Sequence, residues 1–196
     1  MSSTGPRISF SHFGINCFDL EKMTAFYTDV IGFVESDRGD LLNLGEQIRF
    51  LTLDERDHHQ LILCSGRKEG DVVKGAFIGG GLGSAINQLS FRVADLDELR
   101  RVRDRLAAAG VKDGTPVNHG NAWAMYIRDI EGNPMEFFTD TPWYVSQPFG
   151  EPLDLGKSND QILAETEALC RRSPGFEPVE TWRARIADKL ATRHAS

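Results

Sequence analysis

The sequence predicts an α+β protein in which two βαβββ modules pair into a cupped mixed sheet, followed by a C-terminal helical tail. Three observations support this fold class. They are an internal repeat, a period-two alternation of apolar residues in short segments, and a helical spacing of apolar residues after two aspartates. We expect a single domain over residues 1–145 and a helical extension over 146–196.

The repeat aligns the segment beginning at His12 with the segment beginning at Gln88, an offset of 88 − 12 = 76 residues. Asp19 falls on Asp95 at this offset. The offset drifts by two within the following helix and then returns. It pairs further residues later in the copies, Phe50 with Tyr126 and Gln60 with Glu136. The first module therefore covers about 8–66, the second about 86–141, and a glycine-rich linker of about 77–85 lies between them.

Each copy begins with an alternating strand, over 8–17 and 86–93, and continues into a helix. Asp19 and Asp95 occupy the N-cap positions, where a side-chain oxygen accepts from the free amides of the first turn. Glycines end both helices, at Gly32 and Gly110. Three strands then follow each helix, clearest in 48–53, 60–64, 124–128 and 135–137.

The linker and the tail have simpler interpretations. The linker lacks the GxGxxG register and the Gly-Lys-Ser/Thr sequence of a phosphate-binding loop. The tail contains two candidate helices, over 158–171 and 178–192, which we expect to pack on the domain or on a second subunit. Their apolar stripes are Leu163, Thr166 and Cys170, then Trp182, Ile186 and Leu190.

Composition limits the partners and the compartment. A net charge of −7 and a pI near 5.2 argue against nucleic acid or an anionic membrane as the main partner, so we expect a small molecule. The first residues lack a signal sequence and no apolar run is long enough to span a bilayer, which favours the cytoplasm. Three unpaired cysteines are consistent with a reducing compartment. A homodimer is one assembly that we consider.

Four polar residues on the first and last strands of the modules form the predicted site, namely His12, Gln60, Gln88 and Glu136. The two pairs have the same separation, 60 − 12 = 48 and 136 − 88 = 48. A pseudo-twofold axis between the modules would place the pairs opposite each other in the cup. His12 and Glu136 are types that bind metals, so we predict a metal site here.

Residues 8–144 resemble the vicinal oxygen chelate superfamily, and the segment 118–136 resembles the end of a small catechol extradiol dioxygenase. The matching residues are His119, Tyr126, Gly132, Asn133 and Glu136. The resemblance implies Fe(II) held by two histidines and one carboxylate, with open positions for a catechol and dioxygen. It also implies that His119 exchanges a proton with the diol and that Tyr126 donates a hydrogen bond to it.

The sequence departs from this pattern at two positions. Gln88 stands where a second-module histidine is expected, and its neutral oxygen would tolerate Zn, Ni, Mn or Mg comparatively better than imidazole does. Gln60 stands where glyoxalase I would supply a glutamate. Neither named activity therefore matches the full ligand set.

Each candidate also has an ordinary structural interpretation. His12 is satisfied in the core or exposed, Glu136 forms an ion pair, and Gln88 hydrogen-bonds within the sheet. His119 lies in a turn and Tyr126 packs in a strand. We expect His58 and His59 to be exposed turn residues, of which one could reach the pocket. We expect Trp123, Phe137 and Trp143 to form the pocket wall or the core.

The preferred function from sequence is an extradiol-type dioxygenase that uses Fe(II) and dioxygen to cleave an aromatic diol. An isomerase of the glyoxalase or epimerase type, in which a divalent metal polarises a carbonyl or enediolate, is the second hypothesis. A metal-free protein that binds an aromatic or drug molecule in the same cup is the third.

Overall fold

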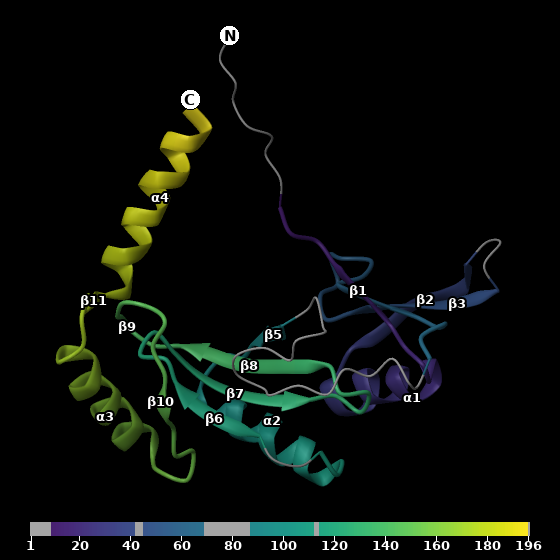
Figure 1. Ribbon diagram of the computed structural model, residues 1–196, viewed down its shortest axis with the longest axis horizontal. Coiled ribbons are helices and arrows are strands. Elements are labelled where there is room, and N and C mark those ends of the chain that lie inside the picture. Colours follow the sequence, from purple (N-terminus) through teal and green to yellow (C-terminus); the bar gives the residue numbers. More distant parts are fainter. Residues whose placement is uncertain (1–8, 42–44, 69–86, 112–113, 196) are drawn as a thin grey trace.

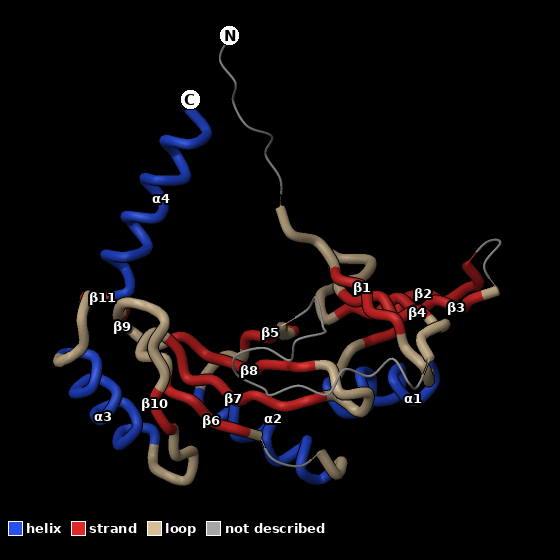
Figure 2. Tube along the Cα trace, in the orientation of Figure 1, coloured by secondary structure: helices blue, strands red, loops and turns tan. Residues whose placement is uncertain are grey.

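The structure is a computed structural model that describes residues 9–41, 45–68, 87–111 and 114–195. Figure 1 shows two lobes, each with a sheet and a helix, and a helical tail that leaves the second lobe. The predicted linker at 77–85 lies outside the described residues. The order of elements confirms βαβββ twice, and Figure 2 shows the strands of the two modules as separate groups.

The first module runs from β1 to β4. Its helix begins at the predicted N-cap, where Asp19 accepts from the amide of Lys22. It changes to π-helical geometry before ending at Gly32, whose φ of 104° suits glycine. The elements are β1 (Phe13–Asn16), α1 (Leu20–Ala25), η1 (Phe26–Ile31), β2 (Val34–Leu41), β3 (Glu46–Thr52) and β4 (Leu61–Cys64).

The second module repeats this order from β5 to β8. Asp95 caps α2 by accepting from the amide of Glu98, as the repeat predicts. Its elements are β5 (Leu89–Arg92), α2 (Leu96–Ala108), β6 (Thr115–Asn118), β7 (Ala122–Arg128) and β8 (Pro134–Asp140). The tail then adds β9 (Trp143–Tyr144), β10 (Glu151–Pro152), α3 (Asn159–Arg171), β11 (Glu177–Pro178) and α4 (Val179–Ala195).

Both sheets are mixed and have corresponding strand orders. The first is β1-β4-β3-β2, and the second is β10-β6-β7-β8-β5, read from the other edge. In each, the first strand pairs in parallel with the last strand, and the other pairs within the module are antiparallel. The tail strand β10 extends the second sheet by pairing with β6.

The register of the sheets corrects one part of the predicted repeat. Glu136 lies beside Ser90 and Tyr126 in the second module, whereas Ile62 lies beside Gly14 and Phe50 in the first. The counterpart of Glu136 is therefore Ile62, at an offset of 136 − 62 = 74 residues, and the predicted pairing of Gln60 with Glu136 is wrong. The hairpins that precede β4 and β8 differ in length, so the offset of 76 ends before the last strand.

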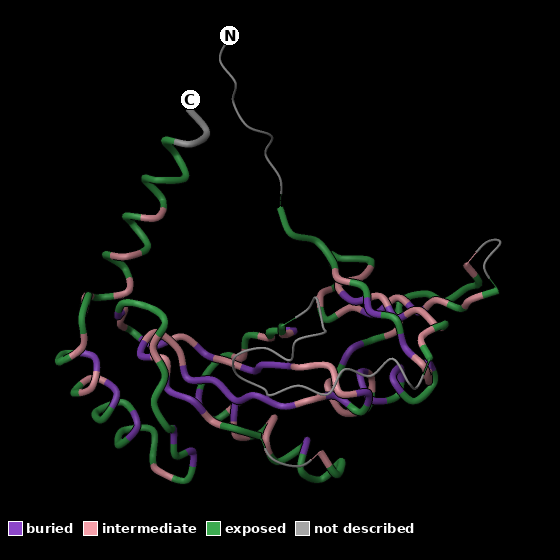
Figure 3. Tube along the Cα trace, viewed as in Figure 1, coloured by how far each residue is buried: buried purple, intermediate pink, exposed green. Residues whose placement is uncertain are grey.

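Alternation along the strands separates the core from the candidate site. On β8, Met135 and Phe137 join the main core, whereas Glu136 points to the other face. Ile15 of β1 belongs to the core, and His12, directly before β1, falls on the opposite face by the same alternation. Trp123 and Phe137 are core residues, and Trp143 packs against the main core. Figure 3 shows the buried residues concentrated in the strands and in α1.

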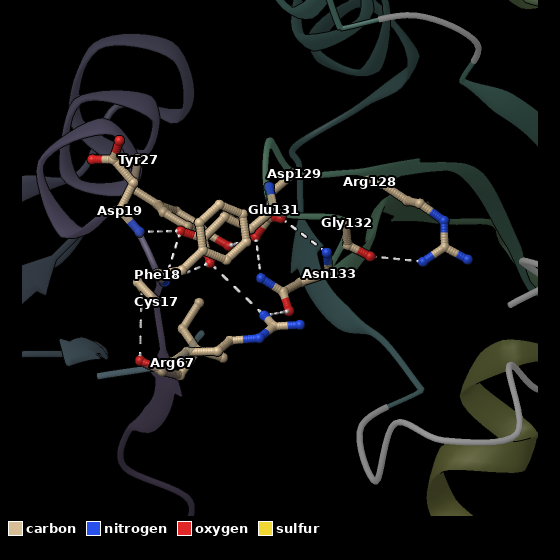
Figure 4. Close-up of polar contacts among 11 residues, drawn as sticks. Cys17, Phe18, Asp19, Tyr27, Arg67, Arg128, Asp129, Glu131, Gly132 and Asn133 are labelled. Atoms are coloured by element: carbon tan, nitrogen blue, oxygen red, sulfur yellow. Dashed lines mark hydrogen bonds and ion pairs between the residues drawn. The ribbon is translucent and has the colours of Figure 1, made fainter. Parts of the chain in front are cut away.

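A polar clamp joins the two modules at the β7–β8 turn (Figure 4). Glu131 accepts hydrogen bonds from the backbone amides of Phe18 and Asp19 at 2.8–3.2 Å, just before α1. Asp129 accepts from the Tyr27 hydroxyl at 3.1 Å and from the Asn133 side chain at 2.8 Å. The turn Asp129–Asn133, which includes the Gly132 and Asn133 of the resemblance, thus holds the first module against the second.

Carboxylates at a helix start are favoured by the free amides there, and the guanidinium of Arg67 lies 3.8 Å from Glu131. Burial nevertheless raises the pKa of Glu131, with the Asp129 charge adding to it and the two amides opposing it. Burial also raises the pKa of Asp129. The turn itself depends on Gly132, whose φ is 84°.

The first tail helix packs on the second module, as predicted. Thr166 of α3 is fully buried and accepts hydrogen bonds from Trp123 and Asn118, each at 2.8 Å. The buried stripe is Ile162, Thr166 and Cys170, so the expected place of Leu163 in it is wrong: Leu163 is 40% exposed. The face of α3 that is buried includes Ile162, the residue before Leu163.

The second tail helix projects away from the body of the molecule (Figures 1 and 3). It is held near its start, where Trp182 stacks on Tyr144 with ring centres 5.4 Å apart. Further along, Leu190 is exposed. Within the described residues, no helix is long and apolar enough to cross a membrane.

Candidate functional site

Glu136 is the centre of a polar cluster on the open face of the second sheet. The register of β5, β8 and β7 places Ser90, Glu136 and Tyr126 in one row across three strands. Ser90 Oγ donates to Glu136 Oε2 at 2.6 Å, and Glu136 as a whole residue is 8% exposed. The Tyr126 hydroxyl also hydrogen-bonds to Glu136. Three adjacent strands thus hold the carboxylate in a fixed position.

Gln88 reaches the same carboxylate from just before β5. Its Nε2 donates to Glu136 Oε2 at 2.7 Å and to Ser90 Oγ at 2.9 Å. The amide therefore presents its nitrogen side to the carboxylate. Rotation of the amide by half a turn would present Oε1 instead, so the same residue can serve a bare carboxylate or a cation bound beside it.

His119 lies in the β6–β7 turn and extends the cluster through Tyr126. Its Nε2 is 2.8 Å from the Tyr126 hydroxyl, and its Nδ1 is 2.6 Å from the carbonyl oxygen of Phe149 in the tail. Gln147 donates to the His119 carbonyl oxygen at 2.9 Å. The C-terminal extension therefore orients a residue of the candidate site.

These contacts define two proton arrangements. A carbonyl only accepts, so Nδ1 of His119 carries a proton. If His119 is neutral, Nε2 accepts the single hydroxyl proton of Tyr126, which then cannot donate to Glu136. If His119 is cationic, Nε2 donates to Tyr126, which can then donate to Glu136. Burial, followed by the hydrogen bond and charge of Glu136, raises the pKa of Tyr126, so its hydroxyl remains a donor at neutral pH.

Apolar residues adjoin this cluster on the same face. Val117, Ala124 and Tyr126 form a small buried cluster, separate from the main core, against which Phe138 packs. Arg92 lies over the Phe138 ring, with its guanidinium carbon 4.8 Å from the ring centre. An aromatic molecule bound here would meet apolar side chains beside an anionic group.

The first module presents a different set. His12 is exposed and contacts His59, with ring centres 4.3 Å apart, and Ser11. His58 and His59 approach through their Nδ1 atoms at 2.9 Å. Burial, followed by the charges of His12 and His58, lowers the pKa of His59. His59 is only partly exposed and packs against His12, whereas the sequence favours an exposed turn residue at this position.

Gln60 does not join Glu136. Its Oε1 accepts from the Leu53 amide at 2.9 Å, and its Nε2 donates to Asp57 at 3.3 Å, so it stabilises its own hairpin. Among the polar contacts found for the described residues, none connects His12 or Gln60 with Glu136. The structure therefore gathers Gln88, Tyr126, His119 and Glu136 and leaves His12 and Gln60 with first-module partners.

The donors around Glu136 fit a divalent cation. Its hydrogen-bond partners are neutral, and no Lys or Arg forms an ion pair with it in the described part of the chain. A buried carboxylate with only neutral partners is stabilised by a cation. A carboxylate and an amide oxygen suit Mn, Fe(II) or Mg. No three His, Cys, Asp or Glu side chains are grouped to hold a metal within 9–41, 45–68, 87–111 and 114–195.

Two partners of the cluster were missed from sequence. Ser90 could have been found, because it follows Gln88 by two residues in a strand and so shares its face. Phe149 could not, because it contributes a backbone carbonyl from a segment whose path depends on the pairing of β10 with β6. The polar cluster thus includes residues that the internal repeat does not identify.

The fold and these residues define a member of a known superfamily. Residues 9–137 match the Glyoxalase/Bleomycin resistance protein/Dioxygenase superfamily, and the chain belongs to this superfamily. The resemblance inferred from sequence is therefore confirmed.

A curated relative and two solved structures extend this placement. The chain is 27% identical over 203 residues to biphenyl-2,3-diol 1,2-dioxygenase 3 of Rhodococcus globerulus, covering 97% of this chain and 89% of that protein. A glyoxylase/bleomycin resistance protein/dioxygenase domain from Frankia sp. EAN1pec has a TM-score of 0.55 at 20% identity, covering 69% of this chain and all of that chain. The fosfomycin resistance protein FosX from Listeria monocytogenes, complexed with Mn(II) and sulfate, has a TM-score of 0.50 at 18% identity, covering 68% and 93%. The two structures support the fold alone.

Proposed function

We propose that this protein is a metal-dependent dioxygenase of the extradiol type, which cleaves the ring of a catechol-like aromatic diol with dioxygen. The observation that carries the proposal is the connected row of Gln88, Glu136, Tyr126 and His119 on one face of the second sheet. Alignment over nearly the whole chain with a biphenyl-2,3-diol dioxygenase supports the choice of substrate class.

The metal would be held by Glu136, by Gln88 through Oε1, and by His12 from the first module. Fe(II) is the preferred ion, with Mn, Zn or Ni as alternatives. When bound, such an ion supplies adjacent coordination positions for the two diol oxygens and for dioxygen. The remaining chemistry depends on residues of this chain.

His119 would hold a proton taken from the diol. Its Nδ1 is fixed by the Phe149 carbonyl, so the proton arrives at or leaves from Nε2, and Tyr126 connects this atom with the Glu136 side of the cluster. Proton transfer by a positioned histidine contributes about 10²–10⁴-fold in rate. Val117, Ala124 and Phe138 would contact the ring of the substrate and limit the water around it.

Oxygen consumption during ring cleavage tests this proposal. The full-length protein would be loaded with Fe(II) under anaerobic conditions, and an oxygen electrode and the absorbance of the yellow product would be followed with catechol, 3-methylcatechol and 2,3-dihydroxybiphenyl. We expect oxygen uptake that matches product formation. Hydroquinone, whose two oxygens cannot chelate one ion, is the matched control. No uptake across the panel despite full iron loading would contradict the proposal.

The presence of Gln88 favours one alternative. A neutral amide oxygen in place of an imidazole suits a redox-inert ion, and an isomerase of the glyoxalase or epimerase type would need such an ion and no oxygen. The same preparations loaded with Zn(II), Ni(II) or Mn(II) and given a hemithioacetal would then show isomerisation. A metal-free binding protein would show neither reaction and would bind the diols with the metal removed.

A further inference from the structure

Two imidazoles lie side by side at the edge of the first sheet. His12 precedes β1 and His59 precedes β4, strands that pair in parallel. Their ring centres are 4.3 Å apart and their planes are tilted by 57°, so the rings are not stacked face to face. Two imidazoles bound to one metal in adjacent positions, with metal–nitrogen distances of about 2.1 Å, have ring centres roughly 4.5–5 Å apart. The observed separation is close to this value.

The Nδ1 atoms of both rings have partners. Nδ1 of His12 lies 3.1 Å from Ser11 Oγ, and Nδ1 of His59 lies 2.9 Å from Nδ1 of His58. Nε2 of His58 faces the Asp37 carboxylate at 3.8 Å, which favours a proton on that nitrogen. Nδ1 of His58 is then the acceptor and Nδ1 of His59 the donor. This arrangement leaves the lone pair of His59 on Nε2.

That lone pair has no partner. Nε2 of His59 is buried and makes no hydrogen bond among the described residues. Unsatisfied buried polar atoms cost free energy and are uncommon in native proteins. Phe50 packs against both His58 and His59, with ring centres 5.4 and 5.1 Å away, and restricts their movement. An imidazole with Nδ1 oriented by a neighbour and Nε2 unpartnered has the arrangement of a metal ligand.

We propose that His12 and His59 bind one divalent transition metal ion through their Nε2 atoms. His59 would thereby supply the imidazole that the second module lacks at Gln88, and the other coordination positions would be filled by water, by substrate or by a carboxylate. The pair suits ions that prefer nitrogen ligands, such as Co, Ni, Cu and Zn. The inference rests on the proposed function only in taking His12 as a ligand.

Metal binding by the full-length apoprotein tests the pair without any turnover. Cu(II) at one equivalent would be followed by electron paramagnetic resonance, in which nitrogen ligands split the signal, and Co(II) affinity would be measured by calorimetry. The wild type should show two coordinated imidazole nitrogens. His59→Gln should show one and should bind Co(II) at least tenfold more weakly, because one of the two imidazoles is gone.

His58→Gln is the matched control, since it removes the neighbouring imidazole and keeps an oxygen that accepts from Nδ1 of His59. We expect two nitrogens and a loss of affinity well below that of His59→Gln. Unchanged nitrogen splitting and affinity in His59→Gln would overturn the inference, and so would equal losses in both variants, which would indicate loose binding by the His-His sequence.

Failure of this inference differs from failure of the proposed function. An active dioxygenase whose His59→Gln variant binds metal like the wild type would refute the imidazole pair alone. A protein that consumes no oxygen with any diol, yet loses one coordinated nitrogen on His59→Gln, would refute the proposed function and support the pair.

Discussion

Glu131 and Glu136 are buried glutamates of the same hairpin, and their partners are of different kinds. Glu131 is 3% exposed and accepts hydrogen bonds from backbone amides of the first module, with Arg67 nearby. Glu136 is 8% exposed and accepts hydrogen bonds only from neutral side chains. The backbone amides that bind Glu131 are fixed in direction. The side chains that bind Glu136 can rotate, so they can give up their hydrogen bonds to the carboxylate when a cation binds it. The first glutamate therefore holds the modules together and the second is suited to a ligand.

The largest expected effect is that of Glu136→Gln on activity. The change keeps the shape of the side chain and removes the charge that would bind the metal. We expect metal content near zero and oxygen uptake reduced by more than about 10³-fold, with a melting temperature within a few degrees of the wild type. Elemental analysis and calorimetric melting measure both. A variant that retained stoichiometric metal would exclude Glu136 as a ligand.

The next effect concerns the proton-handling residue. His119→Ala should lower kcat by about 10²–10⁴-fold while the metal is retained, because the imidazole is not a ligand in this account. Tyr126→Phe, which deletes one hydroxyl and keeps the ring, should have the smaller effect of the two. Steady-state kinetics with metal analysis on the same samples separates the two roles. Loss of metal from His119→Ala would place this residue in the coordination sphere instead.

The other glutamate should affect stability and leave metal binding intact. Glu131→Ala leaves the Phe18 and Asp19 amides without an acceptor, which we expect to cost about 2–4 kcal/mol. For a chain of this size that corresponds to a decrease in melting temperature of roughly 5–12 °C. Thermal unfolding by circular dichroism measures the change. A wild-type melting temperature in this variant would show that the clamp does not stabilise the fold.

The smallest expected effect is a pH dependence of the same clamp. Since burial raises the pKa of Glu131 above its ordinary value, the folded state binds more protons than the unfolded state at pH values between the ordinary and the raised pKa. The stabilisation by this proton is present below the ordinary pKa and is lost as pH rises through the folded one. The melting temperature of the wild type minus that of Glu131→Gln should therefore be greater at pH 5 than at pH 8. A difference that grew with pH would reverse the sign of the coupling.

The fold could be predicted from sequence because its determinants are local. Asp19 and Asp95 act on amides three residues ahead, and the alternation on β1 and β8 assigns faces without reference to the rest of the chain. The counterpart of Glu136 was misassigned because hairpin length, a difference between the modules, shifts the register by two residues. Local pattern identifies a strand and its faces but not its partner.

The site could be predicted only in part for the same reason. Tyr126 and Glu136 fall on neighbouring strands of one sheet and Gln88 directly precedes the next strand, β5, so spacing and resemblance both pointed to them. His119 contacts the carbonyl of Phe149, which is distant in sequence. His12 contacts the ring of His59, which lies in a turn. Side-chain contacts of this kind depend on how loops pack, which period and spacing do not encode.

Gln88→His tests the central claim most directly, because this position separates the sequence from the two-histidine, one-carboxylate pattern. Fe(II) affinity and oxygen uptake with 2,3-dihydroxybiphenyl would be measured for the wild type and the variant, side by side, after anaerobic loading. If Gln88 and Glu136 hold the metal of a dioxygenase, the variant should bind Fe(II) more tightly, and its oxygen uptake should equal or exceed that of the wild type. Fe(II) affinity that is unchanged by the substitution, with no oxygen consumed by either protein, would contradict the account.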